Sequence, residues 1–265
     1  MNRPRGMEPM HLVFAALGGA VLLFIIAPLA GMVLSTGRSE LSRTAADPAV
    51  TASVRLTLLT SMGATLILAV ASVPFAWLLA RRNFPLKALV NGIVDVPIVI
   101  PHSAAGIALL GVIAPGTLVG GTAERLGIEF VGGPAGIMAG MAFVSVPFLV
   151  NAARDGFAAV PLRLEQTALA LGASPLRVFF TISLPLAWRS VLSGLILMWA
   201  RGMSEFGAVL IIAYHPMITP VLIYERFGAF GLRYARPVSV IFIGVCLALF
   251  VVLRLVAGGR RHAGG

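Results

Sequence analysis

The sequence predicts an all-α, polytopic membrane protein with six membrane-spanning helices, organised as one domain over residues 1–265. Three observations carry this prediction. Hydrophobic residues make up 58% of the chain and charged residues 11%, whereas a soluble domain carries about 25% charged residues. Six apolar segments are each long enough, at about 20 residues, to cross a bilayer. The arginines cluster at the ends of these segments, which is typical of membrane proteins.

The six expected spans follow one another with short connections. The first covers residues 11–34, which are apolar throughout. A cleaved signal peptide has a shorter apolar region followed by a small-residue site, so we expect an uncleaved span with the amino terminus inside. The third span contains Pro97 and Pro101, which are expected to break it. The remaining spans are residues 56–80, 88–113, 134–153, 191–213 and 237–256.

The distribution of charge predicts the orientation. The net charge is +10, and the basic residues favour segments 81–87 and 154–190, which places these segments inside under the positive-inside rule. Both termini are then cytoplasmic, in the cell (inner or plasma) membrane. Segments 35–50, 114–133 and 214–236 are expected outside, although the last is unusually basic. A basic chain of this kind is expected to contact membrane lipid and no nucleic acid.

The chain lacks the residues that an enzyme of its own would need. It has no G-x-x-x-x-G-K-[ST] sequence to cradle a nucleotide phosphate, and no paired carboxylates or Ser/His/Asp arrangement stand out. Its four histidines show no metal-pair spacing, and its one cysteine, Cys246, lies in an apolar run. We therefore expect no metal, no cofactor and no catalytic residue. Energy for any transport must come from an ion gradient or from a partner protein.

Segment 161–190 lies between two strongly apolar segments, yet it holds Arg163, Glu165, Arg177 and Arg189. Leu164, Ala168 and Leu171 share one helical face, and Gly172 is expected to end that helix in a left-handed conformation. Ser174 and Pro175 can begin a second helix as N-cap and first helical residue. Leu184-Pro185 is expected to end it. The sequence thus predicts a cytoplasmic helix–turn–helix, within a loop of about 154–190.

This stretch resembles the loop signature of ABC importer permeases. Gly172 is followed, after nine residues, by Ile182-x-Leu184-Pro185, as in the family consensus E-A-A-x-x-x-G, nine residues, I-x-L-P. In that register Gln166 replaces the consensus glutamate, and Glu165 lies one residue before it. The resemblance implies a coupling loop that docks on a separate ATP-binding subunit, through Glu165, Gln166, Ala168, Gly172, Ala173, Leu176, Phe179, Phe180, Leu184 and Pro185.

Within this coupling loop, the aromatic and leucine side chains are the expected docked face. We expect Leu176, Phe179 and Phe180 to contact the partner, and Phe179→Asp to abolish its binding. Glu165→Gln is expected to do little, because Glu165 is offset by one residue from the consensus. An ordinary amphipathic interfacial loop is the alternative interpretation.

A second set of residues lies in the expected third and fifth spans. Arg201 and Glu205 are four residues apart and can pair on a helix, and charges at membrane depth normally face a bundle interior or a water-filled path. The alternative is a self-neutralising pair that only packs spans together. The block 200–208 and the Pro-broken segment 95–106 resemble the molybdate/tungstate/sulfate branch of these permeases. The expected path residues are Asp95, Pro97, Pro101, His102, Arg201, Ser204 and Glu205.

The basic outer segment has a corresponding interpretation. Residues 214–227 are similar to archaeal-type molybdate/tungstate permeases, and Arg226, Arg233 and Arg236 would face the side from which an oxyanion arrives. Several arginines can attract an anion or an acidic protein surface. The resemblance therefore implies docking of an extracytoplasmic oxyanion-binding protein there. Surface charges that anchor the ends of the spans are the alternative.

Together, the resemblances imply the homodimeric permease of a type I ABC importer for a tetrahedral oxyanion, molybdate or tungstate. Its partners would be two copies of the ATP-binding subunit, the binding protein and a second copy of itself. A sulfate or thiosulfate permease is the nearest alternative. An ion-coupled secondary transporter is the alternative from another class, and its coupling carboxylates would have to be Asp95 and Glu205, the two mid-span acids.

Overall fold

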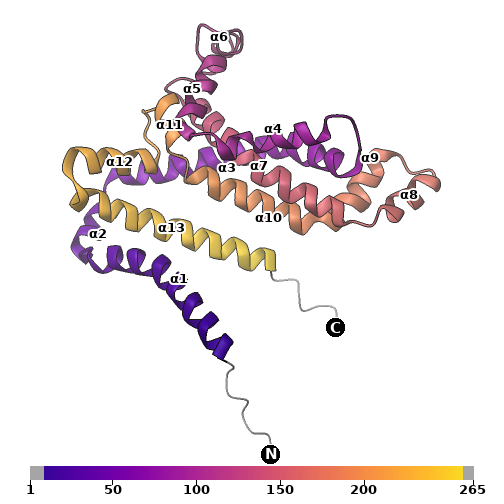
Figure 1. The fold of residues 1–265 in the computed structure, drawn as a ribbon. Helices are drawn as coiled ribbons and strands as arrows, with labels where there is room; N and C mark the ends of the chain where they lie inside the picture. The colour runs from indigo at the N-terminus through magenta and orange to yellow at the C-terminus, as the bar shows by residue number, and fades with distance from the viewer. Residues whose placement is uncertain (1–8, 259–265) are drawn as a thin grey trace, which may run out of the picture.

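The computed structural model describes residues 9–258 as a bundle of long helices with short helices at its ends (Figure 1). No strand occurs among these residues, so the predicted all-α class is confirmed for the described chain. The elements in order are α1 (Pro9–Leu34), α2 (Arg38–Ala45), α3 (Pro48–Arg81), α4 (Lys87–Val99), α5 (His102–Ile113), α6 (Leu118–Arg125), α7 (Pro134–Ala159), α8 (Leu162–Ala170), α9 (Pro175–Val178), the π-helical turn η1 (Phe179–Ser183), α10 (Leu184–Met203), α11 (Gly207–Ile212), α12 (Thr219–Phe230) and α13 (Leu232–Gly258).

Five of the described helical segments are long and apolar enough to cross a membrane. They correspond to α1, α3, α7, α13 and the continuous segment Pro175–Met203 that runs from α9 through α10. A sixth span exists only if the bent pair α4 and α5 is taken as one. The chain is therefore a helical membrane protein with five to six candidate spans.

The expected third span is broken, as its prolines predicted. Helices α4 and α5 meet at 115°, and the break lies at Ile100, whose extended backbone (ψ 146°) precedes Pro101. The residue before a proline avoids the helical region, which explains the position of the break. Pro97, by contrast, stays inside α4 and does not end it.

The expected fifth span, residues 191–213, is wrong at both ends. Helix α10 begins earlier, at Leu184, and ends at Met203, after which α11 forms a separate short helix from Gly207. Glu205 therefore lies beyond the end of the helix that carries Arg201. The break in residues 88–113 was predicted from its prolines, whereas the break in residues 191–213 was not, because this run contains no proline and its apolar composition gives no sign of a break.

The expected helix end at Leu184-Pro185 is also wrong. Leu184 has helical dihedral angles, and its N–H donates to the carbonyl of Phe179, five residues earlier. This π-helical turn η1 joins α9 to α10 without a stop. A π turn rearranges the local hydrogen bonds, and a proline in the first turn of the following helix has no helical N–H bond to lose.

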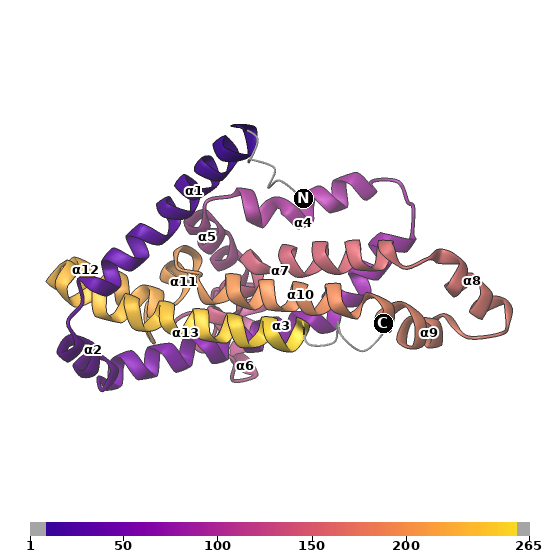
Figure 2. The same cartoon turned by 90° about the horizontal axis from the view of Figure 1, so that it is seen from below.

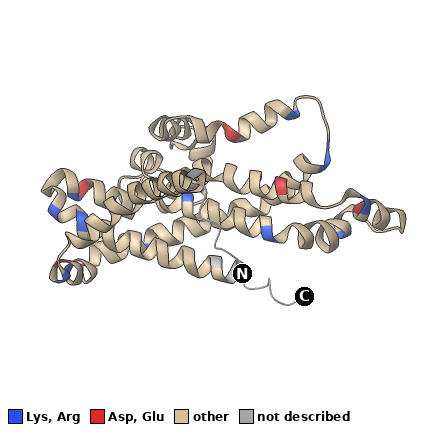
Figure 3. Ribbon diagram, turned by 60° about the horizontal axis from the view of Figure 1, so that its bottom comes forward, with Lys and Arg blue, Asp and Glu red and all other residues tan. Residues whose placement is uncertain are grey.

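The segments expected as outer loops contain helices of their own. Helix α2 lies within 35–50, α6 within 114–133 and α12 within 214–236, and α13 begins at Leu232, ahead of the expected start at residue 237. Composition predicted their polarity, and two of these helices have a local side-chain cap: Glu40 accepts from the Gly37 N–H ahead of α2, and the Thr117 hydroxyl accepts from the Gly120 N–H of α6. The first N–H of α12, that of Thr219, instead donates to the Thr57 hydroxyl of α3. Figure 3 shows the charged residues concentrated towards the two ends of the bundle.

Helix α7 is the centre of the bundle, and α3 and α10 pack along it (Figures 1 and 2). The core between them includes Phe157, Leu149 and Met198, all fully buried. Gly156 permits the closest approach, because a Cβ there would lie 2.3 Å from Ser190 Cβ of α10. Helix α1 stands apart from this core, and its apolar side chains are exposed.

Candidate functional site: a loop held by an ion pair and a charged cluster at two helix breaks

The predicted coupling loop is attached to the bundle through a buried ion pair. Glu165 of α8 is 4% exposed, and Arg81 at the end of α3 donates from Nε to both of its carboxylate oxygens at 3.0 Å. Arg81 Nη2 also donates to Glu165 Oε1 at 2.8 Å and to the Val160 carbonyl at 2.9 Å. Ser183 of η1 donates to the same carboxylate at 2.7 Å. One carboxylate thus joins α3, α8 and η1.

This geometry corrects two expectations about the loop. Glu165 is not a peripheral residue, because it holds the loop on the bundle. Phe179 is 7% exposed and packs against Trp77 and Phe157 in the core, with ring centroids 5.7 and 5.9 Å away, so it does not lie on the exposed face. The π-helical turn directs the two adjacent phenylalanines differently, and sequence spacing alone did not reveal this.

The exposed face of the loop is formed by other apolar side chains. Leu176 is 68% exposed and Phe180 57% exposed, and Leu171, which had been assigned only to a helix face, is 83% exposed. Gly172 lies between them with a φ of +88°, as predicted for the residue that ends α8. Gln166 and Pro185 are exposed, whereas Ala168, Ala173 and Leu184 are half-buried. The large exposed leucines and Phe180 form an apolar surface at the tip of the protein.

A charged cluster joins the two helix breaks. Arg201 Nη2 lies 3.1 Å from Glu205 Oε2 and 2.8 Å from His102 Nε2, and His102 Nδ1 lies 3.4 Å from the same Glu205 oxygen. The predicted pairing of Arg201 with Glu205 is confirmed. His102, which begins α5, comes from a segment 99 residues away from Arg201, and only the tertiary structure brings it here. We call His102, Arg201 and Glu205 the break cluster.

One member of the break cluster, His102, lines an open cavity of about 500 Å³. At the wall of this cavity α5 and α11 approach closely, because residue 207 is a glycine: a Cβ there would lie 2.9 Å from His102 Cβ. Glu205 is fully buried, while the side chain of Arg201 is 21% exposed and that of His102 40% exposed. Residues lining the cavity are Ile100, Pro101, His102, Ser103, Ser204, Phe206, Gly207, Leu210 and Ile211.

Two of the predicted path residues lie away from the break cluster. Asp95 accepts a hydrogen bond from Asn151 Nδ2 of α7 at 2.7 Å, and Pro97 is buried inside α4. The partner Asn151 was missed because a single amide in an apolar span has no sequence signal of its own. Asp95 thus links α4 to α7, while Pro101, His102, Arg201, Ser204 and Glu205 come together at the breaks.

The three outer arginines are engaged with neighbouring elements. Arg226 of α12 pairs with Asp47, which precedes α3, and Arg233 Nε lies 3.4 Å from Glu40 of α2. Arg236 donates to the Ser35 carbonyl at 2.9 Å. These contacts tie α12 and α13 to the α2 region. Arg233 remains 83% exposed and available to a partner, whereas Arg226 is largely used within the chain.

The Asp47–Arg226 pair predicts an acid-dependent stability. The hydrogen bond from Arg226 is the main cause that lowers the pKa of Asp47 below its ordinary 3.8. A carboxyl whose folded-state pKa is lowered stabilises the fold above pH 3.8 and loses this contribution as pH falls through the folded-state value. We expect the difference in melting temperature between wild type and Asp47→Asn, measured in detergent, to shrink towards zero as the pH falls from 5 to 2. A constant difference would contradict this.

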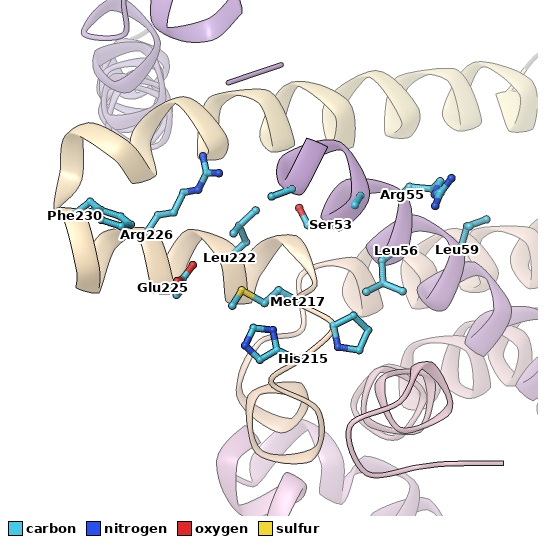
Figure 4. Close-up of a pocket in the computed structure, with 13 residues that line it drawn as sticks. Ser53, Arg55, Leu56, Leu59, His215, Met217, Leu222, Glu225, Arg226 and Phe230 are labelled. Atoms are coloured by element: carbon cyan, nitrogen blue, oxygen red, sulfur yellow. The ribbon is translucent and has the colours of Figure 1, made fainter. Parts of the chain in front are cut away.

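A larger pocket, of about 750 Å³, lies beside the Asp47–Arg226 ion pair, between α3 and the segment leading into α12 (Figure 4). Arg55, His215, Glu225 and Arg226 contribute charged or polar groups to it. Leu56, Leu59, Met217, Leu222 and Phe230 contribute apolar surface. An open pocket lined by both polar and apolar residues is suited to contact with a partner at this end of the bundle.

No group of three or more His, Cys, Asp or Glu side chains that could hold a metal ion occurs within residues 9–258. The break cluster, with one acid, one histidine and one arginine, has the composition of an ion-pair network. Its chemistry is the recognition of charge.

Comparison with known proteins agrees with these features. Residues 72–259 match the family described as "Binding-protein-dependent transport system inner membrane component". The chain is 46% identical to the molybdate/tungstate transport system permease protein WtpB of Pyrococcus abyssi, over 94% of this chain and 96% of that one. It is 40% identical to WtpB of Methanocaldococcus jannaschii, over 94% and 97%. The sulfate transport system permease protein CysT of Synechocystis sp. is 28% identical, over 92% and 88%.

The fold also matches solved transporters. A bacterial ABC transporter involved in the import of alginate superposes with a TM-score of 0.72 at 16% identity, over 94% of this chain and 96% of that one. The MetNI methionine ABC transporter gives a TM-score of 0.59, over 79% and 93%. The family match and the identity over nearly the whole length of these relatives show that the chain belongs to the binding-protein-dependent inner membrane components, the translocating permease subunits of ABC transporters.

Proposed function

We propose that the chain translocates molybdate or tungstate across the cell membrane as the permease of an ABC importer. The observation that carries the substrate is the 40–46% identity to the WtpB permeases over nearly the full length of both chains. Identity to the sulfate permease of Synechocystis is 28%, which makes sulfate the second candidate. The orientation that fits the charge distribution has both termini in the cytoplasm.

Two copies of the chain would form the translocating unit, with one ATP-binding subunit docked on each coupling loop. The apolar tip formed by Leu171, Leu176 and Phe180 supports this docking, because exposed apolar patches of this kind mark interaction sites. Closure of the ATP-binding subunits would displace α8 and α9. The displacement would reach α3 through the Glu165–Arg81 pair and α10 through the continuous helix after η1.

Substrate would enter at the opposite end of the bundle. The exposed Arg233 and the pocket at Arg55 and His215 support docking of an extracytoplasmic oxyanion-binding protein there. The break cluster, Pro101 and Ser204 would line the path, and Asp95 and Pro97 would support it by fixing α4 against α7. Movement between outward- and inward-facing states follows the logic of two global conformations whose populations shift with ATP.

Reconstituted transport tests the function. The permease, its ATP-binding subunit and its binding protein are placed in proteoliposomes, and uptake of radioactive molybdate is followed with ATP on the cytoplasmic side. We expect uptake that tungstate suppresses and a hundredfold excess of sulfate does not. Equal suppression by sulfate would favour the sulfate permease, and calorimetry of the binding protein with the three anions would show the same order. Uptake without ATP would favour the secondary transporter.

The exposed tip of the loop predicts which side chains matter for docking. Phe180→Asp is expected to weaken binding of the ATP-binding subunit at least tenfold, since truncating a central interface aromatic costs about 2 kcal/mol or more. Binding is measured by surface plasmon resonance on the detergent-solubilised permease. Phe227→Asp, at the opposite end of the bundle and 55% exposed, is the matched control. Equal binding by the two variants would place the docked face elsewhere.

A further inference from the structure

Two arginine–glutamate ion pairs within residues 9–258 have a buried carboxylate, and they differ in how many hydrogen bonds that carboxylate accepts. The Arg81–Glu165 pair has hydrogen bonds to both carboxylate oxygens, with further bonds from Ser183 and to the Val160 carbonyl. In the Arg201–Glu205 pair, Glu205 Oε1 accepts from the Ala208 N–H at 2.9 Å. Its Oε2 is buried and has no hydrogen-bond partner among the described residues, although Arg201 lies within ion-pair distance.

The two pairs therefore differ in how much hydrogen bonding offsets the burial of their carboxylates. Buried charges are stable only when good geometry and additional hydrogen bonds offset their desolvation. The first pair meets this requirement and has the character of a permanent structural link. The second neutralises Arg201 through one contact of 3.1 Å, so Arg201 has fewer bonds to Glu205 to give up than Arg81 has to Glu165 when it exchanges one anionic partner for another.

The surroundings of Arg201 are suited to a second anionic partner. Its side chain and that of His102 are partly exposed, whereas Glu205 is fully buried behind them. Ser103 and Ser204 line the nearby cavity of about 500 Å³, and α5 begins at its wall. Broken helices in transporters present such first turns to anionic groups. Arg201 Nη2 donates to His102 Nε2 at 2.8 Å and Arg201 Nη1 donates to the Ser204 hydroxyl at 3.4 Å, so the guanidinium contacts two residues of the cavity wall.

We propose that the cavity at the two helix breaks is a transit site for the oxyanion, in which Glu205 is the resident counter-ion that the cargo replaces on Arg201. When no cargo is present, Arg201 rests against Glu205. An arriving tetrahedral dianion accepts hydrogen bonds from Arg201, Ser103 and Ser204, while Glu205 keeps its bond from the Ala208 N–H and its contact with His102 Nδ1, 3.4 Å from Oε2. When the anion leaves, Arg201 returns to Glu205, so its charge has a partner in both states.

This exchange explains how a permease can hold an anion without trapping it. The anion has to displace a carboxylate, which lowers its net affinity by the free energy of the Arg201–Glu205 contact. The inference rests on the proposed function, because it assumes an oxyanion as cargo. Beyond that function, the inference states that Arg201 binds the anion and that Glu205 weakens this binding.

Binding of radioactive molybdate to the permease–ATP-binding subunit complex in lipid nanodiscs, measured by equilibrium dialysis without the binding protein, tests the exchange. Glu205→Gln keeps an oxygen for the Ala208 N–H and loses the charge. We expect it to tighten molybdate binding at least about tenfold, the lower end of measured couplings between close charges. It should also slow turnover in the transport assay, since release becomes limiting. Glu124→Gln, at an exposed glutamate on α6, is the charge-matched control and should change neither.

Loss of the cationic partner gives the opposite result. Arg201→Gln alone leaves Glu205 buried and unpaired, so the double variant Arg201→Gln/Glu205→Gln is used, which buries no charge. It is expected to remain folded by thermal melting and to lose saturable molybdate binding. Unchanged or weaker binding in Glu205→Gln, or retained binding in the double variant, would overturn the inference. If the wild-type complex binds and transports another anion and not molybdate, the proposed substrate fails and the same variants test the exchange with that anion.

Discussion

Replacing Arg81 with methionine is expected to destabilise the permease by about 3–5 kcal/mol, the cost of removing one partner from a buried ion pair. Glu165 is 4% exposed and would keep only the Ser183 hydroxyl as a side-chain donor. Because this carboxylate joins α3, α8 and η1, the coupling loop should detach before the bundle unfolds. Thermal unfolding in detergent and co-purification of the ATP-binding subunit measure the two effects.

The control for this prediction is the adjacent Arg82, which is exposed. Arg82→Met should leave stability and co-purification nearly unchanged, since it loses a solvated charge. The double variant Arg81→Met/Glu165→Leu should recover most of the stability, because replacing a buried pair with apolar residues of similar volume is often neutral. If Arg81→Met and Arg82→Met behave alike, the ion pair does not hold the loop.

Substitution of Gly156 by alanine is expected to have the second largest effect. The added Cβ would lie 2.3 Å from Ser190 Cβ, so α7 and α10 must separate at this contact. Overpacking of this kind costs about 1–3 kcal/mol. It should also reduce ATP-dependent transport, since α10 leads directly from the coupling loop to the break cluster. Thermal unfolding and molybdate uptake are measured on the same preparation.

A compensating change separates crowding from other effects of the substitution. Ser190→Gly removes the atoms that the new methyl group would meet, so Gly156→Ala/Ser190→Gly should regain most of the lost stability. The gain is limited by about 1 kcal/mol, the cost of a glycine within a helix. Should the double variant be no more stable than Gly156→Ala, then contact with Ser190 is not the cause.

Prediction from sequence succeeded where one residue type has one local consequence. Gly172 ends α8 with positive φ, and Pro101 breaks the third span at the residue before it. Prediction from sequence failed where contacts with other parts of the fold determine the local structure. Pro185 was expected to end a helix, yet η1 carries the helix past it, and Phe179 was expected at the surface, yet Trp77 and Phe157 enclose it.

The sequence by itself determined the class of protein, the approximate spans, and the Gly and Leu-Pro positions that resemble a coupling loop. These depend on composition, periodicity and local backbone preference, which are properties of nearby residues. Only the tertiary structure decided which charges meet. Arg81 and Glu165 are 84 residues apart and His102 and Arg201 are 99 apart, and neither contact has a periodic signal. Burial removes water as an alternative hydrogen-bond partner of both carboxylates. Glu165 therefore depends on Arg81 and Ser183 and fixes the loop to the bundle, whereas one oxygen of Glu205 is left without a hydrogen bond.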